Sequence, residues 1–136
     1  MYLTARYSDG FTEHLLSWKL TAIDGWAELE AAWFRPEPRM QNFRAEFPIS
    51  LTPLRNALPA LQVLDEKYEA AWDDLEHRDL VVESGDVILR RRVYGLGALI
   101  RQHPELRAFQ EVWNWIEGEV LVHLPPEFTP TRKARR

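Results

Sequence analysis

Residues 103–125 read HPELRAFQEVWNWIEGEVLVHLP and combine two hydrophobic periodicities. At about 100° per residue, one apolar arc of a helix would hold Leu106, Phe109, Val112, Trp113 and Ile116. Pro104 suits the first turn of that helix, and Gly118 suits its end. Beyond the glycine, the alternation over 120–124 predicts a strand. A helix over 104–117 with so much aromatic surface must bury it, and a β-sheet is its natural partner.

The composition is that of a folded, non-membrane domain. A chain of 136 residues fits one domain, and its 46% hydrophobic content argues against disorder. Six Trp residues should dominate the core or a contact face. The absence of Cys excludes disulfides, thiolate catalysis and Cys-ligated zinc, and it suits a reducing compartment. Because neither a signal peptide nor a run of about 20 apolar residues is visible, we expect a cytoplasmic protein.

The first third of the chain predicts a hairpin followed by a helix. Asp9-Gly10 is typical of a two-residue hairpin turn, which would pair Arg6 with Glu13 and Leu3 with Leu16. A helix is predicted over 24–35, because its residues Trp26, Leu29 and Trp33 would share one face. As a strand, the same segment would set Trp26 beside Glu28 and Glu30.

The middle of the chain predicts a strand, a long helix and a second hairpin. Residues 40–49 alternate as a strand does, and Thr52-Pro53 indicates a helix start. The helix is expected over 53–78, with an interruption or kink at Pro59. Residues 80–94 would then turn either at Ser84-Gly85 or at Gly85-Asp86, and the sequence leaves both registers open.

These elements predict a single α+β domain over residues 1–128. Its mostly antiparallel sheet should carry three main helices, over 24–35, 53–78 and 104–117. Residues 129–136 are expected to form a mobile basic tail.

No motif assigns catalytic chemistry, a metal or a cofactor. The spacing of Glu69, Asp73 and His77 would align three ligands on one helix, but a solvated acidic face produces the same spacing. There is no nucleophile elbow and no phosphate-binding glycine loop. We therefore assign no catalytic residue and expect no cofactor, while an enzyme whose site the sequence conceals stays an alternative.

The predicted helix 53–78 has an acidic arc beside its apolar stripe. The arc consists of Asp65, Glu66, Glu69, Asp73 and Glu76. Such a surface speeds encounter with a basic partner. Trp115 lies at the edge of its own helix's apolar arc, where partial exposure would make it an interface anchor. The preferred hypothesis is therefore a non-enzymatic module that binds a protein with a basic surface.

Basic residues support an alternative, nucleic-acid binding. The candidates are Arg90, Arg91 and Arg92, together with Arg132 and Lys133 of the tail. On a strand, however, Arg90 and Arg92 would point one way and Arg91 the other, so the three do not form one patch. Salt bridging to Asp79 across the hairpin is the competing structural explanation.

Residues 7–33, YSDGFTEHLLSWKLTAIDGWAELEAAW, resemble the start of many small immunity proteins of bacterial polymorphic toxin systems. Those proteins often begin with a strand, an Asp-Gly turn, a strand ending near a Ser-Trp pair, and a helix. Here the turn is Asp9-Gly10, the pair is Ser17-Trp18, and the helix would start near Asp24. The resemblance covers about a quarter of the chain. It implies a cytoplasmic inhibitor without catalysis that blocks a toxin, commonly a nuclease with a basic surface.

Overall fold

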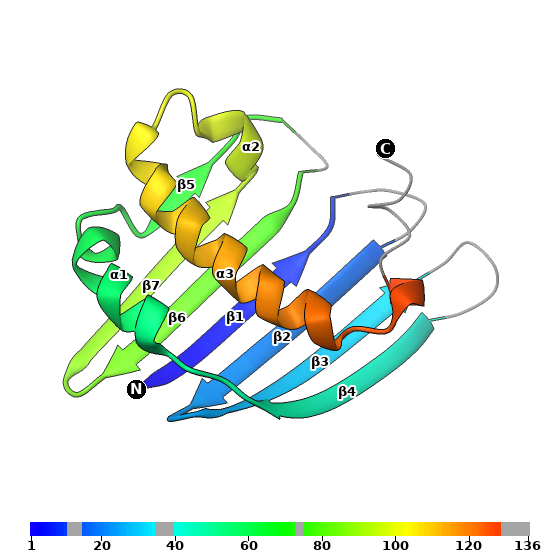
Figure 1. Cartoon of the computed structure of the whole chain (residues 1–136). Coiled ribbons are helices and arrows are strands. Elements are labelled where there is room, and N and C mark those ends of the chain that lie inside the picture. Colours follow the sequence, from blue (N-terminus) through cyan, green and yellow to red (C-terminus); the bar gives the residue numbers. More distant parts are fainter. Residues whose placement is uncertain (11–14, 35–39, 73–74, 129–136) are drawn as a thin grey trace.

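The computed structural model describes residues 1–10, 15–34, 40–72 and 75–128, and it consists of one sheet with helices on one face (Figure 1). The strands are β1 (Tyr2–Ser8), β2 (Leu15–Ile23), β3 (Trp26–Phe34), β4 (Met40–Pro48), β5 (Lys67–Glu69), β6 (His77–Ser84) and β7 (Val87–Tyr94). The helices are α1 (Thr52–Gln62), α2 (Leu96–Leu99) and α3 (Arg107–His123), with 3₁₀ turns η1 (Pro104–Leu106) and η2 (Pro126–Phe128). The predicted fold class, α+β with three helices on a mostly antiparallel sheet, is confirmed.

The sheet joins two chain segments through a central pair of strands. The strand order is β4-β3-β2-β1-β6-β7-β5, so β1 to β4 form a meander and β6 pairs with β1. Every pairing is antiparallel except that of the short edge strand β5, which runs parallel to β7. The first strand of the chain therefore lies in the middle of the sheet.

The predicted helix over 24–35 is wrong, because these residues form β3. Asp24 and Gly25 make a tight turn with φ values of 34° and 91°. The strand then alternates: its buried residues are Ala27, Leu29, Ala31 and Trp33, whereas Trp26, Glu28 and Glu30 are exposed together. The mixed face that argued against a strand is permitted because an antiparallel sheet needs only one buried face.

The predicted helix over 53–78 is also wrong in its length. It begins one residue before the predicted start, at Thr52, but α1 ends at Gln62 and the chain continues into β5. Arg91 of β7 donates from Nε to the Leu61 carbonyl at 2.9 Å and from Nη2 to the Gln62 carbonyl at 3.2 Å. These carbonyls belong to the last turn of a helix, which lacks intrahelical partners, so the arginine stabilises the end of α1. The strand predicted over 40–49 is confirmed as β4.

Both predicted hairpins exist. The structure corrects the register of the first and decides between the two registers left open for the second. In the first, Arg6 lies opposite Lys19 and Leu3 opposite Ala22, so the pairings expected from a two-residue turn are wrong. The Asp9 carboxylate accepts the Leu16 N–H at 2.9 Å and helps to close a longer connection, of which 11–14 lie outside the described residues. In the second hairpin, Ser84 pairs with Val87, which selects the turn at Gly85-Asp86.

Helix α3 runs past its predicted end. It continues through Gly118 to His123, so the strand expected over 120–124 is wrong. An exposed glycine inside a helix costs about 1 kcal/mol relative to alanine. Val120 is fully buried one turn beyond Ile116, and continuing the apolar stripe of the helix outweighs that cost.

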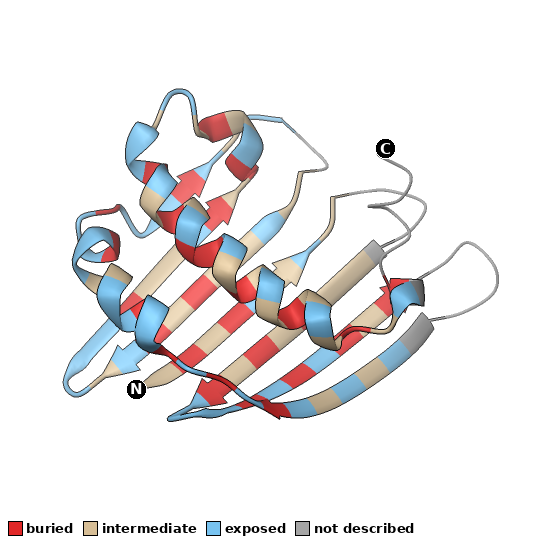
Figure 2. Ribbon diagram, viewed as in Figure 1, coloured by how far each residue is buried: buried red, intermediate tan, exposed pale blue. Residues whose placement is uncertain are grey.

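Aromatic stacking holds α3 on the sheet, as the periodicity predicts. The Trp113 ring stacks on Trp18 of β2 with centroids 5.5 Å apart, and on Phe109 at 5.7 Å. Trp18 stacks in turn on Tyr7 of β1 at 5.6 Å. Figure 2 shows the buried residues concentrated where α3 crosses the strands. These rings connect the helix to the centre of the sheet.

We expect Trp113→Ala to lower the free energy of unfolding by about 3–5 kcal/mol, because it leaves a cavity between α3 and β2. Val122→Ala is the matched control on the same helix, since Val122 is 79% exposed, and its effect should stay within about 0.5 kcal/mol. Urea unfolding of both variants measures the difference. Similar losses in the two variants would contradict the packing described here.

Candidate functional site

The second face of the sheet, here called the open face, is the candidate site. All three helices lie on the opposite face, and within the described residues no helix crosses this one (Figure 1). Antiparallel sheets often leave one face to solvent, so exposure alone assigns no function. The types of side chain that the strand register brings together on the open face are more informative.

One row of side chains across the open face, the charged row, takes a residue from each strand. From β4 to β5 it consists of Arg44, Glu30, Lys19, Arg6, Asp79, Arg92 and Lys67. Five are cations and two are carboxylates, which gives a net charge of +3 at neutral pH.

Both carboxylates of the charged row are held by arginines away from its centre. Glu30 lies 3.7 Å from Arg44. Asp79 accepts Nη2 of Arg90 at 3.0 Å, and Nε of Arg92 lies 3.9 Å away. The hydrogen bond from Arg90 to Asp79, together with the charge of that carboxylate, raises the pKa of the Arg90 guanidinium.

Arg6 and Lys19, at the centre of the row, lie directly opposite each other. Within the described part of the chain, neither has a carboxylate within 4.0 Å. Like charges in directly opposite positions of two strands are destabilising. Their other cross-strand neighbours, Asp79 for Arg6 and Glu30 for Lys19, have the opposite charge but form their ion pairs with arginines instead.

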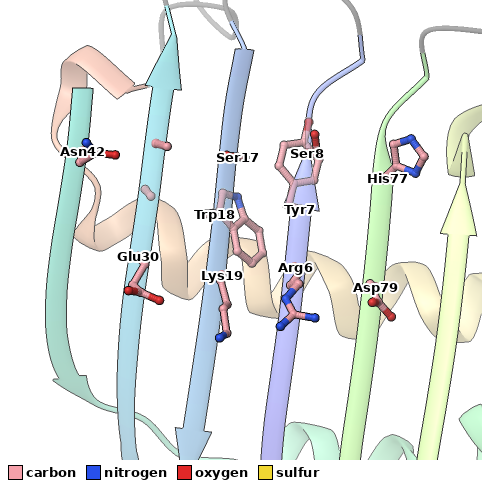
Figure 3. A pocket seen from close by; sticks show the side chains of 12 residues that line it. Arg6, Tyr7, Ser8, Ser17, Trp18, Lys19, Glu30, Asn42, His77 and Asp79 are labelled. Atoms are coloured by element: carbon pink, nitrogen blue, oxygen red, sulfur yellow. The ribbon is translucent and has the colours of Figure 1, made fainter. Parts of the chain in front are cut away.

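A hollow of about 410 Å³ lies over this pair of cations (Figure 3). Its outward-pointing lining consists of Arg6, Ser8, Ser17, Lys19, Glu30, Ala32, Asn42, His77 and Asp79. Tyr7, Trp18 and Ala31 also border it, but strand alternation directs their side chains toward the helices. Apart from the two engaged carboxylates, the polar lining offers positive charge and hydrogen-bond donors.

A second row, the apolar row, lies at the other end of the same strands. It consists of Pro48, Trp26, Ile23, Tyr2, Glu83 and Ile88, in order from β4 to β7. Trp26 is 51% exposed, Ile23 54% and Ile88 71%. Scattered surface apolar residues are ordinary, but a contiguous set on one face indicates a contact site.

Acidic residues flank the apolar row. Glu28 of β3 lies directly opposite Glu46 of β4 in the next row along the strands, and Glu83 belongs to the apolar row itself. All three are exposed, and no ion pair to them occurs within the described residues. This end of the open face is therefore apolar with a negative border.

The acidic arc predicted for helix 53–78 does not form, because that helix ends at Gln62. Asp65 and Glu66 are exposed between α1 and β5, Glu69 is exposed on β5, and Glu76 is half-buried before β6. Asp73 lies outside the described residues. Glu69 pairs with Lys67 at 3.4 Å.

The structure also places the predicted interface tryptophan and the residues with metal-ligand spacing. Trp115 is half-buried beside the core, as its position at the edge of the arc predicts. Glu69 and His77 lie on different strands with β7 between them, so the predicted helical alignment of metal ligands does not exist. The described residues contain no group of three potential metal ligands.

The arginines proposed for nucleic acid are largely engaged within the fold. Arg90 and Arg92 face the open side and Arg91 the helical side, as predicted from alternation. Arg91 is held by α1, and Arg90 by Asp79. The expected salt bridge across the hairpin is thus confirmed. Arg132 and Lys133 lie outside the described residues.

The sequence hypotheses missed the residues that matter most on the open face, namely Arg6, Lys19, Ile23 and Trp26. The sequence did contain a signal for β3, because apolar residues occupy positions 27, 29, 31 and 33, and Glu28 and Glu30 lie between the first three. Recognising that strand would have placed Trp26 and both glutamates on one exposed surface.

No protein-family description matches the chain, and none of the curated proteins matches it. Among the described helices, none has both the length and the apolar character needed to span a bilayer.

A half-buried tyrosine, Tyr7, packs below the hollow. The Tyr7 hydroxyl donates to Asp9 Oδ1 at 2.5 Å, and the Arg78 guanidinium carbon lies 5.4 Å from the centre of the Tyr7 ring. Burial raises the pKa of Tyr7, and the hydrogen bond to the Asp9 carboxylate raises it further. Folding therefore favours the neutral phenol, which ties the end of β1 to the start of the connection.

This raised pKa predicts a loss of stability at alkaline pH. Below pH 10 both the folded and the unfolded chain keep the Tyr7 proton, whereas above it the unfolded chain loses the proton first, so stability falls as pH rises. Tyr7→Phe keeps the ring and removes this titration. Urea unfolding at pH 8 and pH 10.5 should show a steeper decline for the wild type than for Tyr7→Phe. Equal declines would contradict the assignment.

Proposed function

We propose that this protein is a non-enzymatic binding module, an immunity-type inhibitor that docks the apolar row of the open face on a protein with a basic surface. The observation that carries the proposal is the exposure of Trp26 beside Ile23, with Ile88 farther along the same row and exposed glutamates around them. The partner class is unchanged from the sequence hypothesis, but the surface that supports it is new.

The apolar row has the composition of an interface core. Trp and Tyr anchors dominate the binding energy of many interfaces, and here Trp26 lies beside Ile23, which lies beside Tyr2. These side chains are fixed on adjacent strands rather than on loops. Little conformational entropy is lost when such a pre-organised surface binds.

The flanking charges favour a basic partner. Glu28 and Glu46 lie opposite each other, which destabilises the free protein slightly, and a partner's Lys or Arg would relieve that repulsion. A nuclease toxin carries such a basic surface, and blocking it is the role that the resemblance implies. Of the elements that the resemblance implies, the fold has the two strands, β1 and β2, whereas the residues expected to form a helix near Asp24 form β3.

We expect Trp26→Ala to weaken partner binding by at least about 2 kcal/mol, roughly 30-fold in Kd, as for a central interface tryptophan. Glu28→Lys should weaken it further by slowing association, and this effect should shrink at high salt. The partner is first captured from the native host with the wild-type protein and then purified. Surface plasmon resonance measures its rate constants with each variant.

Trp72→Ala is the matched control, because Trp72 is 66% exposed but does not belong to any strand of the open face. It should bind as the wild type does. A captured partner that is acidic, or one that binds Trp26→Ala and Trp72→Ala equally well, would overturn the proposal.

A further inference from the structure

The two central cations of the charged row point to a second binding site. Arg6 and Lys19 face the hollow side by side, and Figure 3 shows them between Glu30 and Asp79 on the neighbouring strands. Each of these carboxylates is already held from its far side, by Arg44 and by Arg90 respectively. The fold thus keeps two like charges together, and among the described residues neither cation has a carboxylate within 4.0 Å, although Asp79 lies opposite Arg6 and Glu30 opposite Lys19 in the row.

We infer that the hollow binds the phosphate group of a small phosphomonoester. Such a group carries a charge of about −1.5 to −2 at pH 7 and three acceptor oxygens. Two adjacent cations match this charge, whereas a single carboxylate would leave one of them unmatched. Charge-assisted hydrogen bonds from the Arg6 guanidinium and the Lys19 ammonium would anchor the phosphate.

The rest of the lining suits the body of such a ligand. Ser17 and Asn42 supply a hydroxyl and an amide from β2 and β4, and His77 supplies an imidazole from β6. The Ser8 hydroxyl makes one long hydrogen bond, 3.4 Å to the Asp9 carbonyl, and it can rotate toward a ligand. A volume of about 410 Å³ falls in the range of small-molecule sites.

The surroundings favour a small ligand over a nucleic-acid strand. A polyanion crossing the open face along the strands would leave the charged row and meet Glu28, Glu46 and Glu83. A single phosphate group requires only the centre of the row.

This site is separate from the apolar row. Arg6 lies four positions along β1 from Tyr2, which corresponds to about 13 Å. Variants can therefore test the two surfaces independently, and failure of one proposal leaves the other standing.

The test titrates the full-length protein with inorganic phosphate at constant ionic strength and follows backbone amide shifts by NMR. We expect saturable shifts at Arg6, Ser17, Lys19 and His77, with acetate giving much smaller ones. Arg6→Gln and Lys19→Gln should each weaken binding at least about tenfold, the effect of losing one charge-assisted hydrogen bond. Glu30→Gln should strengthen it, because a negative charge is removed from the lining.

Arg55→Gln is the matched control, because it removes one exposed positive charge from α1 on the opposite face. Its phosphate affinity should equal that of the wild type. Thermal unfolding checks the fold: each variant removes the repulsion between Arg6 and Lys19 but also the attraction to the carboxylate opposite, so its Tm should stay close to that of the wild type. Without phosphate, those two variants and the wild type should also give matching amide spectra away from the hollow.

Three results would overturn the inference. One is the absence of saturable shifts at the lining residues. Another is an equal loss of affinity in Arg55→Gln. The third is a single-stranded oligonucleotide that shifts the same amides at far lower concentration than phosphate, which would assign the hollow to nucleic acid.

Discussion

The stacking of Trp113 on Trp18 is the contact on which this structure depends. It places α3 across the middle of a seven-stranded sheet, so that one face of the sheet is covered. Because all three helices lie on that face, the other must be built from side chains that tolerate water. The covered face therefore determines where function can reside.

The open face has two different kinds of surface, the apolar row and the charged row, at different positions along the strands. At one end the row is mostly apolar and has glutamates in and beside it, and near the other end Arg6 and Lys19 line a hollow between two carboxylates. Each arrangement contains one pair of like charges in directly opposite positions, Glu28 with Glu46 and Arg6 with Lys19, and such pairs do not stabilise a sheet. Unfavourable local pairings of this kind are expected where a surface serves to bind another molecule.

The sequence predicted the packing of α3 because five apolar residues recur at helical spacing and all of them are buried. The prediction of a helix in place of β3 failed for a physical reason. It assumed that Trp26 must be buried on one face with Leu29 and Trp33, whereas Trp26 is exposed. The predicted end of α3 at Gly118 is wrong because local propensity is weaker than the burial of Val120. The end of α1 depends on Arg91, some 30 residues later in the chain, and no local pattern reveals such a contact.

The candidate site was harder to predict than the fold. Strand register decides which charges become neighbours, and a shift of one residue would place Arg6 on the opposite face. The turn chemistry at Asp9-Gly10 suggested a tight loop, whereas the actual pairing begins with Ser8 opposite Ser17. Charge totals over sequence windows could not reveal a row assembled from seven separate strands.

The central position of β1 has a consequence for biosynthesis. Its partner β6 lies some 70 residues later in the chain, so the N-terminal meander leaves the ribosome before its inner edge can pair. During that interval the meander carries unpaired backbone groups along β1 and an apolar face that α3 does not yet cover. Such a nascent intermediate is prone to intermolecular association, and chaperone protection would be most valuable at this stage of synthesis.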